Sequence, residues 1–107
     1  MTESAPTVVN IPGPRMRLEE STGMRTELLR HLETGNTRLV LDFTQVDFVD
    51  SSFLGLLIIV LKRANADGGD VRICCLRPQL VSIFTLMRLD KLFRVFETRA
   101  EAIESFQ

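Results

Sequence analysis

A short polar segment directly precedes the most apolar stretch of this sequence. Asp50, Ser51 and Ser52 come immediately before residues 53–61, which are apolar apart from Gly55. Asp and Ser are favoured at the N-cap of a helix because their side-chain oxygens accept hydrogen bonds from backbone N–H groups that lack an intrahelical partner. Helix capping alone is a sufficient explanation for these three residues, so any further chemistry has to be argued from other parts of the chain.

The remaining reactive side chains do not form a recognisable catalytic set. The single histidine, His31, lies in a polar helical segment, and the chain has neither a Ser–His–Asp order typical of a hydrolase nor a glycine-rich phosphate loop. Cys74 and Cys75 are adjacent and lack the second spaced pair that a tetrahedral zinc site requires. We interpret them as small core residues on a buried strand. We therefore expect no enzyme activity, no metal and no cofactor.

Composition and charge limit the classes of function. The chain has 107 residues, of which 45% are hydrophobic and 25% charged, as in one soluble globular domain. Its formal charge is -1 and it has neither Trp nor Tyr, which disfavours nucleic acid as a partner. Residues 1–10 do not resemble a secretion signal, and the apolar run is shorter than the roughly 20 residues that cross a bilayer. We therefore expect a cytoplasmic protein without membrane insertion.

The apolar pattern predicts strands that alternate with helices. A strand begins at Val8, and the prolines at positions 12 and 14 confine it to a sheet edge. Apolar residues spaced by three and four positions predict a helix over 18–32. The other expected elements are strands over 38–43, 70–76 and 92–96 and helices over 53–66, 78–89 and 99–106. This alternation is typical of an α/β fold with parallel neighbouring strands.

Three segments of the chain resemble one known family. They are L-V-L-D-F-T-Q-V-D-F-V-D-S-S-F-L-G-L-L, K-R-A-N-A-D-G-G-D-V-R-I and L-D-K-L-F-R-V-F-E-T-R-A-E-A. Together they resemble the STAS domain of bacterial anti-sigma factor antagonists, over nearly all of the chain from Val8 onward. The resemblance implies a single STAS-like α/β domain over residues 8–107, with a central mixed, mainly parallel sheet and about four helices. A flexible N-terminus is expected over residues 1–7.

The resemblance also implies a partner switch. In this family an unphosphorylated antagonist binds an anti-sigma factor, which is often a serine kinase, and so frees the sigma factor. The kinase phosphorylates the serine that directly follows the Asp of the D-S-S motif, and a serine phosphatase reverses the modification. By position the phosphorylated residue is Ser51, with Asp50 as its acidic neighbour and Ser52 as the adjacent, normally unmodified serine.

The helix that follows the motif is the expected docking surface. It is apolar nearly all round, whereas a surface helix normally carries one apolar stripe. One interpretation leaves part of this apolar surface exposed to a partner, and the other has the helix over 78–89 cover it completely. The side chains expected to be exposed are Phe53, Leu56, Leu57 and Val60. The residues expected to bind the partner are Asp50, Ser52, Phe53, Leu54, Leu56 and Leu57.

Two positions depart from the usual family pattern. Phe53 stands where a glycine is most frequent, which is expected to place a large side chain beside the acceptor serine. Met16 stands where an acidic residue usually helps the partner contact, and Arg15 and Arg17 add positive charge to the same loop. These departures favour an alternative function, a structural STAS subunit of a larger assembly such as an ABC-type lipid transport complex. The intact D-S-S motif favours switching.

Overall fold

The centre of the molecule is a sheet of four parallel strands. The computed structural model describes residues 5–107. Its strands lie in the order β1 (Thr7–Asn10), β3 (Arg38–Asp42), β5 (Asp70–Cys74) and β6 (Arg94–Phe96). Every pairing within the described residues is parallel. β1 lies at one edge of the sheet, as the prolines that follow it predict.

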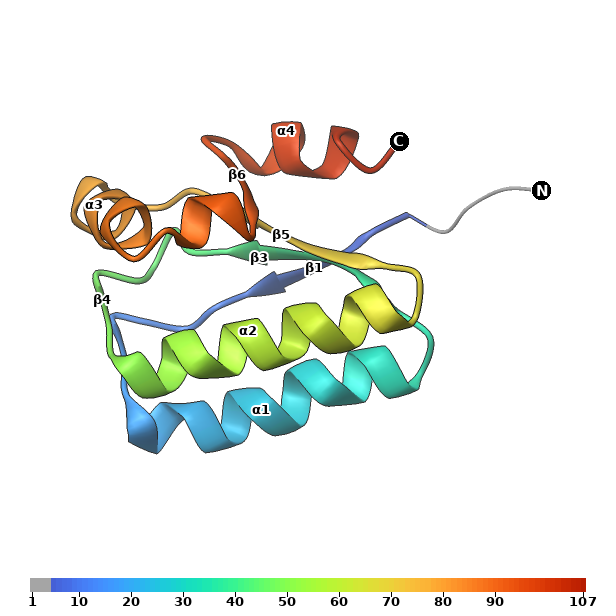
Figure 1. Cartoon of the computed structure of the whole chain (residues 1–107), viewed down its shortest axis with the longest axis horizontal. Coiled ribbons are helices and arrows are strands. Elements are labelled where there is room, and N and C mark those ends of the chain that lie inside the picture. Colours follow the sequence, from blue (N-terminus) through green and yellow to red (C-terminus); the bar gives the residue numbers. More distant parts are fainter. Residues whose placement is uncertain (1–4) are drawn as a thin grey trace.

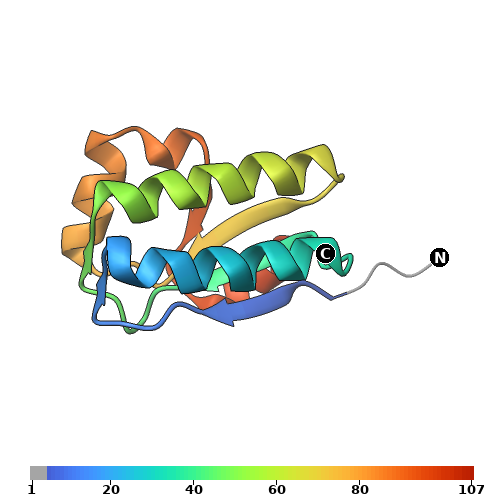
Figure 2. The ribbon, with the colours of Figure 1, turned by 90° about the horizontal axis from the view of Figure 1, so that it is seen from below.

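Helices cover the two faces of this sheet unequally (Figure 1). α1 (Leu18–Glu33) and α2 (Ser51–Ala66) run side by side along one face, as Figure 2 shows from the helical side, and α4 (Arg99–Glu104) lies on the other face. α3 (Pro78–Leu86) lies at the end of the molecule where α2 begins. This arrangement confirms the predicted α/β fold with a mainly parallel sheet and about four helices. The sheet was expected to be mixed, but within the described residues it contains no antiparallel pair.

The apolar spacing of α1 explains why it packs against α2. Its buried apolar residues, Met24, Leu28 and Leu32, recur every four positions and therefore share one face of the helix. α1 ends at Glu33, and Gly35 then adopts a left-handed conformation with φ +94°, which costs a glycine little. Together with β1, β3 and β5, the two helices enclose the main hydrophobic core.

The opposite face of the sheet carries a smaller core under α4. Its buried residues are Val40, Cys74, Ala102 and Phe106. The helix begins with a capping box, in which the Thr98 hydroxyl accepts a hydrogen bond from Glu101 N and the Glu101 carboxylate accepts one from Thr98 N, each at 3.2 Å. A helix this short buries little apolar area, so other contacts have to hold it in place.

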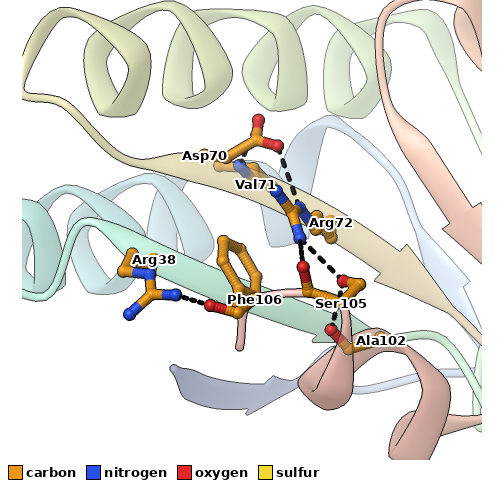
Figure 3. A network of polar contacts seen from close by, with 7 residues as sticks. All are labelled: Arg38, Asp70, Val71, Arg72, Ala102, Ser105 and Phe106. Atoms are coloured by element: carbon orange, nitrogen blue, oxygen red, sulfur yellow. Dashed lines mark hydrogen bonds and ion pairs between the residues drawn. The ribbon is translucent and has the colours of Figure 1, made fainter. Parts of the chain in front are cut away.

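Two arginines from neighbouring strands hold the C-terminal end of α4 (Figure 3). Arg72 of β5 donates hydrogen bonds to the carbonyl and hydroxyl oxygens of Ser105, and Arg38 of β3 donates one to the carbonyl of Phe106. The Arg72 guanidinium also lies 3.9 Å from the centre of the Phe106 ring, within cation–π range. Asp70 accepts a hydrogen bond from Arg72 Nε at 3.0 Å, which fixes the guanidinium in this position.

A buried carboxylate anchors the other end of α4. Asp42, the last residue of β3, is 4% exposed and lies 2.8 Å from the Arg99 guanidinium. Its other oxygen accepts hydrogen bonds from the Thr44 backbone N at 2.8 Å and from the Thr44 hydroxyl. Burial by itself raises the pKa of Asp42, but the hydrogen bonds from Thr44 and Arg99 outweigh burial and hold the pKa below its ordinary value.

Two very short strands near the start of α2 were not predicted from the sequence. β2 (Arg15–Met16) pairs in parallel with β4 (Phe48–Val49), within segments whose pattern indicates loops. Gly13 allows the two segments to approach closely, because a Cβ atom there would lie 1.7 Å from the carbonyl oxygen of Gln45. This pairing brings the start of α2 next to the start of α1.

Several predicted boundaries differ from the structure. The strand expected over 92–96 begins at Arg94, because a 3-10 helix, η1 (Leu89–Lys91), and its C-cap occupy the preceding residues. The strand expected over 70–76 ends at Cys74, because Cys75 adopts φ 66°. In a strand that continued to residue 76, alternation would place Cys75 on the same face as Val71. Because the strand ends first, Cys75 packs with the smaller core instead. α3 ends at Leu86 and α4 at Glu104, each earlier than predicted.

The expected flexible N-terminus, residues 1–7, lies largely outside the described residues. β1 already includes Thr7, one residue before the expected start of the domain at Val8.

Candidate functional site

Asp50 caps the N-terminal ends of two helices. Its Oδ1 accepts a hydrogen bond from Phe53 N at 3.0 Å in the first turn of α2, and its Oδ2 accepts one from Leu18 N at 3.0 Å at the start of α1. Asp50 N donates to the Met16 carbonyl at 3.1 Å. Because the N-terminal end of a helix carries partial positive charge, a carboxylate between two such ends is electrostatically favoured. The predicted cap is confirmed, and it serves α1 as well as α2.

Ser51 and Ser52 are the first two residues of α2, and both are exposed. Neither hydroxyl makes a hydrogen bond to any other residue within 5–107. The capping function of the D-S-S motif therefore belongs to Asp50. The Ser51 hydroxyl is open to a modifying enzyme, and a phosphate placed there would lie at the positively polarised end of the helix.

A groove of about 310 Å³ lies between α1 and α2 beside these serines. Its lining includes Leu18, Thr22 and Arg25 of α1 and Ser52, Gly55 and Ile59 of α2. Leu18 is 63% exposed and Ile59 is 45% exposed, so apolar surface is available on both sides of the groove. A side chain at Gly55 would meet nothing within 4 Å, which leaves the middle of the groove open. This shape suits a partner that inserts side chains beside Ser51.

The apolar side chains of α2 that were expected to be exposed are buried. Phe53, Leu57 and Val60 have no exposed surface, and Leu54 and Leu56 are 5% exposed. α2 is apolar nearly all round because it packs on the sheet and on α1 at once, so the covering helix is α1 and not the helix expected over 78–89. The prediction that these side chains are available to a partner is therefore wrong for the free chain.

The exposed side of α2 follows from helical spacing. Gly55 and Ile59 lie four and eight positions after Ser51, on the same side of the helix, and all three are exposed. This signal is present in the sequence, but the continuous apolar run hides it. Phe53 points into the core, with its ring edge-on to Phe43 at a centroid distance of 6.3 Å. The expectation that Phe53 crowds the acceptor serine is therefore also wrong.

A second hollow, of about 410 Å³, lies beside β2 and β4. Arg15, Arg17, Asp47 and Phe48 line it, so the two arginines bring positive charge to this end of the molecule. Met16 lies between them in sequence but is 1% exposed. Its side chain belongs to the core, so the surface of this loop is set by its arginines and not by the methionine.

One cluster of potential metal ligands lies under α4. Asp42, Cys74 and Cys75 each place a ligand atom within 4.8 Å of the others. The Asp42 carboxylate is already bound by Arg99 and Thr44, and burial raises the pKa of the Cys74 thiol. A metal ion at this position would have to displace a guanidinium and take the proton from a buried thiol. The cluster therefore suits a buried Cys74 thiol packed beside an ion pair better than it suits a metal site.

Comparison with known proteins places this geometry in a family. The family model described as STAS domain matches residues 2–102. The Bordetella bronchiseptica protein named "Putative anti-sigma factor antagonist BtrV" is 26% identical over 84 residues, which cover 78% of this chain and 72% of that protein. Within residues 5–107, no helix has the length and apolar character needed to cross a membrane.

Two solved structures share the fold. An anti-sigma-factor antagonist (STAS) domain protein from Planctomyces limnophilus has a TM-score of 0.86 at 26% identity, covering 97% of this chain and 93% of that one. The phosphorylated form of the Bacillus cell fate determinant SpoIIAA has a TM-score of 0.74 at 20% identity, covering 100% of this chain and 96% of that one. Because the family model spans almost the whole sequence, the chain belongs to the STAS domain family.

Proposed function

We propose that this chain is an anti-sigma factor antagonist that works by phosphorylation-dependent partner switching. The unphosphorylated form binds an anti-sigma factor in the cytoplasm, a serine kinase phosphorylates Ser51 and ends that binding, and a serine phosphatase restores it. The chain acts by binding and performs no catalysis itself. Two kinds of similarity support the proposal: relatives named as anti-sigma factor antagonists, and a structural neighbour, SpoIIAA, solved in a phosphorylated form.

The observation that carries the proposal is the position of Ser51. Its hydroxyl is exposed and makes no hydrogen bond within the described residues, so the fold does not depend on it. It lies beside a groove with exposed apolar side chains from two helices. A residue that the fold does not need, next to a surface that suits a partner, is where a modification can control binding without unfolding the protein.

Phosphorylation has opposite consequences for the chain and for its partner. A phosphate adds about -1.5 to -2 charges at pH 7. Within the chain, the positive end of α2 offsets part of this charge, by about 0.3 to 2 kcal/mol. A partner seated over the groove instead buries the phosphate next to Asp50, which adds desolvation and like-charge repulsion. Binding is therefore lost while the fold is kept.

The residues expected to bind the partner divide into two groups. Asp50 and Ser52 lie at the start of α2 and contribute to the contact directly. The second group contributes only indirectly, because its side chains are buried and hold α2 against the sheet and α1. This group consists of Phe53, Leu54, Leu56 and Leu57. The apolar contact itself is assigned to Leu18 and Ile59, which are exposed on the two sides of the groove.

The modification is tested by incubating the purified protein with ATP and each serine kinase of its organism, followed by mass spectrometry. We expect one phosphate, absent in Ser51→Ala and retained in the matched variant Ser52→Ala. The unmodified protein, but not the phosphorylated one, should then bind an anti-sigma factor, with affinity reduced about tenfold or more by the phosphate. Absence of phosphate with every kinase, together with stable copurification of a transporter ATPase, would instead support the structural-subunit alternative.

The division between fold and binding is tested by Ser51→Asp. We expect its free energy of unfolding to stay within about 0.5 kcal/mol of the wild type, because the hydroxyl has no partner to lose and a negative charge suits this helix end. Urea denaturation followed by circular dichroism measures this change. A Ser51→Asp protein that is unfolded would contradict the proposed division, because loss of binding would then follow from loss of structure.

A further inference from the structure

The lining of the α1–α2 groove contains one charged residue among those that the structure describes. It is Arg25 of α1, and the other lining residues are apolar, carry a hydroxyl or are glycine. Arg25 is exposed, and within residues 5–107 its side chain makes neither an ion pair nor a hydrogen bond. The positions three and four residues away on α1 hold no carboxylate, since they are Ser21, Thr22, Leu28 and Leu29. The guanidinium can therefore bind a carboxylate from another protein.

The acidic residues of the two helices do not face the groove. α2 contains none over its whole length. On α1, three of the four lie about 120° or more around the helix from Arg25, at about 100° per residue. These are Glu19, Glu20 and Glu27, and the fourth, Glu33, is the last residue of α1, more than two turns away.

Asp50 lies at the start of the groove, where its charge is already engaged. Its two carboxylate oxygens accept the hydrogen bonds that cap α1 and α2, so it faces the backbone N–H groups of both helices. On the other side of the balance, Lys62 is exposed and lies three positions after Ile59, on the same side of α2. The groove is therefore basic, with Arg25 inside it and Lys62 beyond its end.

The middle of the groove has room for an apolar side chain. Gly55 lies there, and a Cβ atom at this position would meet nothing within 4 Å. Leu18 of α1 and Ile59, one turn further along α2, are exposed on the two sides of the groove. A side chain that enters beside Gly55 can contact both, and it does so in the groove that Arg25 lines.

These charges distinguish between possible occupants. A second copy of the same face would bring two basic grooves together without a carboxylate on either α2, which is unfavourable. A protein segment that carries a carboxylate next to an apolar side chain complements both parts of the groove. Since α1 and α2 run side by side over their whole length, such a segment can lie along the seam between them (Figure 2).

We propose that the α1–α2 groove binds a segment of the anti-sigma factor in which an apolar side chain is adjacent to a carboxylate. The apolar side chain enters beside Gly55, between Leu18 and Ile59, and the carboxylate pairs with Arg25. This inference rests on the proposed function, because it names the chemistry of the partner at the same site. It also explains the effect of the modification, since a phosphate on Ser51 repels the partner's carboxylate from the same groove.

The contact with Arg25 is tested by isothermal titration calorimetry of the full chain with the anti-sigma factor that it binds, selected from the purified anti-sigma factors of its organism. Arg25→Gln should weaken binding about tenfold or more, because it leaves the carboxylate without a cation. Its affinity should also fall less steeply with added NaCl than that of the wild type. The matched variant Arg30→Gln removes an exposed arginine about 140° around the same helix and should bind like the wild type.

The space beside Gly55 is tested in the same assay by Gly55→Leu. This variant should weaken binding about tenfold or more, because its side chain fills the space that the partner needs. Leu favours a helix more than Gly does, and the new Cβ meets nothing within 4 Å, so the fold should be kept, as circular dichroism can check. The matched variant Gly23→Leu adds the same side chain on the outer side of α1, in equally open space, and should bind like the wild type.

The outcomes separate this inference from the proposed function. If the wild type binds the anti-sigma factor and either Arg25→Gln or Gly55→Leu binds it equally well, the inference is overturned and the proposed function stands. An unchanged dependence on NaCl in Arg25→Gln also overturns it, because no carboxylate is then recognised there. If the wild type binds none of the anti-sigma factors, the proposed function fails and the inference fails with it. A dimer in sedimentation that Gly55→Leu dissociates would show that the groove binds a second copy instead.

Discussion

The two faces of the central sheet are stabilised in different ways. On the helical face, α1 and α2 bury a continuous apolar core. On the other face, one short helix covers a small core and is held by charged hydrogen bonds, from Arg99 to Asp42 at its start and from Arg72 and Arg38 at its end. The difference shows that where a short helix cannot bury enough apolar area, arginines on the neighbouring strands and on the helix itself supply the attachment.

The largest effect is expected from Phe53→Ala on the helical face. Phe53 has no exposed surface and packs edge-on against Phe43, so its truncation leaves a cavity in the main core. We expect a loss of about 3–5 kcal/mol in the free energy of unfolding. Urea denaturation measures it, with Ile59→Ala on the exposed side of the same helix as the control, expected within about 0.5 kcal/mol of the wild type. A loss of less than about 1 kcal/mol for Phe53→Ala would remove the contrast between the faces.

A smaller and more local effect is expected from Phe106→Ala on the other face. The ring lies in the smaller core and under the Arg72 guanidinium. We expect a loss of about 2 kcal/mol, below the range for a central Phe, because the ring covers only the end of α4. Hydrogen exchange should accelerate in α4 while α1 and α2 keep their protection. Faster exchange throughout the chain would show that the two faces unfold together.

The smallest effect is expected from Arg99→Gln, which removes the charged partner of Asp42. We expect a loss of about 1 kcal/mol near neutral pH, since the Arg99 side chain is itself nearly half exposed to solvent. The pKa of Asp42 in the folded chain lies below its ordinary value of 3.8. The stabilisation that ionised Asp42 gives to the folded chain is therefore complete above about pH 3.8, the pKa of the unfolded chain. It is lost as the pH falls through the lower pKa of the folded chain.

The control for this prediction is the variant Asp42→Asn, whose unfolding is compared with that of the wild type over a range of acidic pH. In Asp42→Asn the group no longer titrates, so the free energy of unfolding should decrease less on acidification than in the wild type. Thermal denaturation across the acid range compares the two proteins. An identical acid dependence in both would mean that the Asp42–Arg99 contact does not stabilise α4 in solution.

The regular elements could be predicted from the sequence because periodicity reveals them. The helix over 18–32, the helix over 53–66 and the central strand over 38–43 all lie where their apolar spacing indicates. β2 and β4 could not be predicted, because a strand of two residues is too short to show the alternation of apolar and polar residues that identifies a strand. The turn at Cys75 was missed for a different reason: the backbone there leaves the extended region at a residue that rarely does so.

The candidate site was predicted less completely than the fold. The D-S-S motif located Asp50 and the two exposed serines, and helix capping explains Asp50. Which face of α2 is exposed depends on α1, a helix distant in sequence, so the apolar run alone could not distinguish Leu57 from Ile59. The hydrogen bond from Leu18 to Asp50 joins residues 32 positions apart, and no local pattern indicates it.

The double cap at Asp50 bears on how related chains should be interpreted. Since one carboxylate begins two helices, selection for folding alone is enough to retain it, whether or not a related chain is phosphorylated. An aspartate at this position is therefore poor grounds for assigning a chain to a signalling pathway. The informative position is the next one, because no contact among residues 5–107 requires a hydroxyl at Ser51.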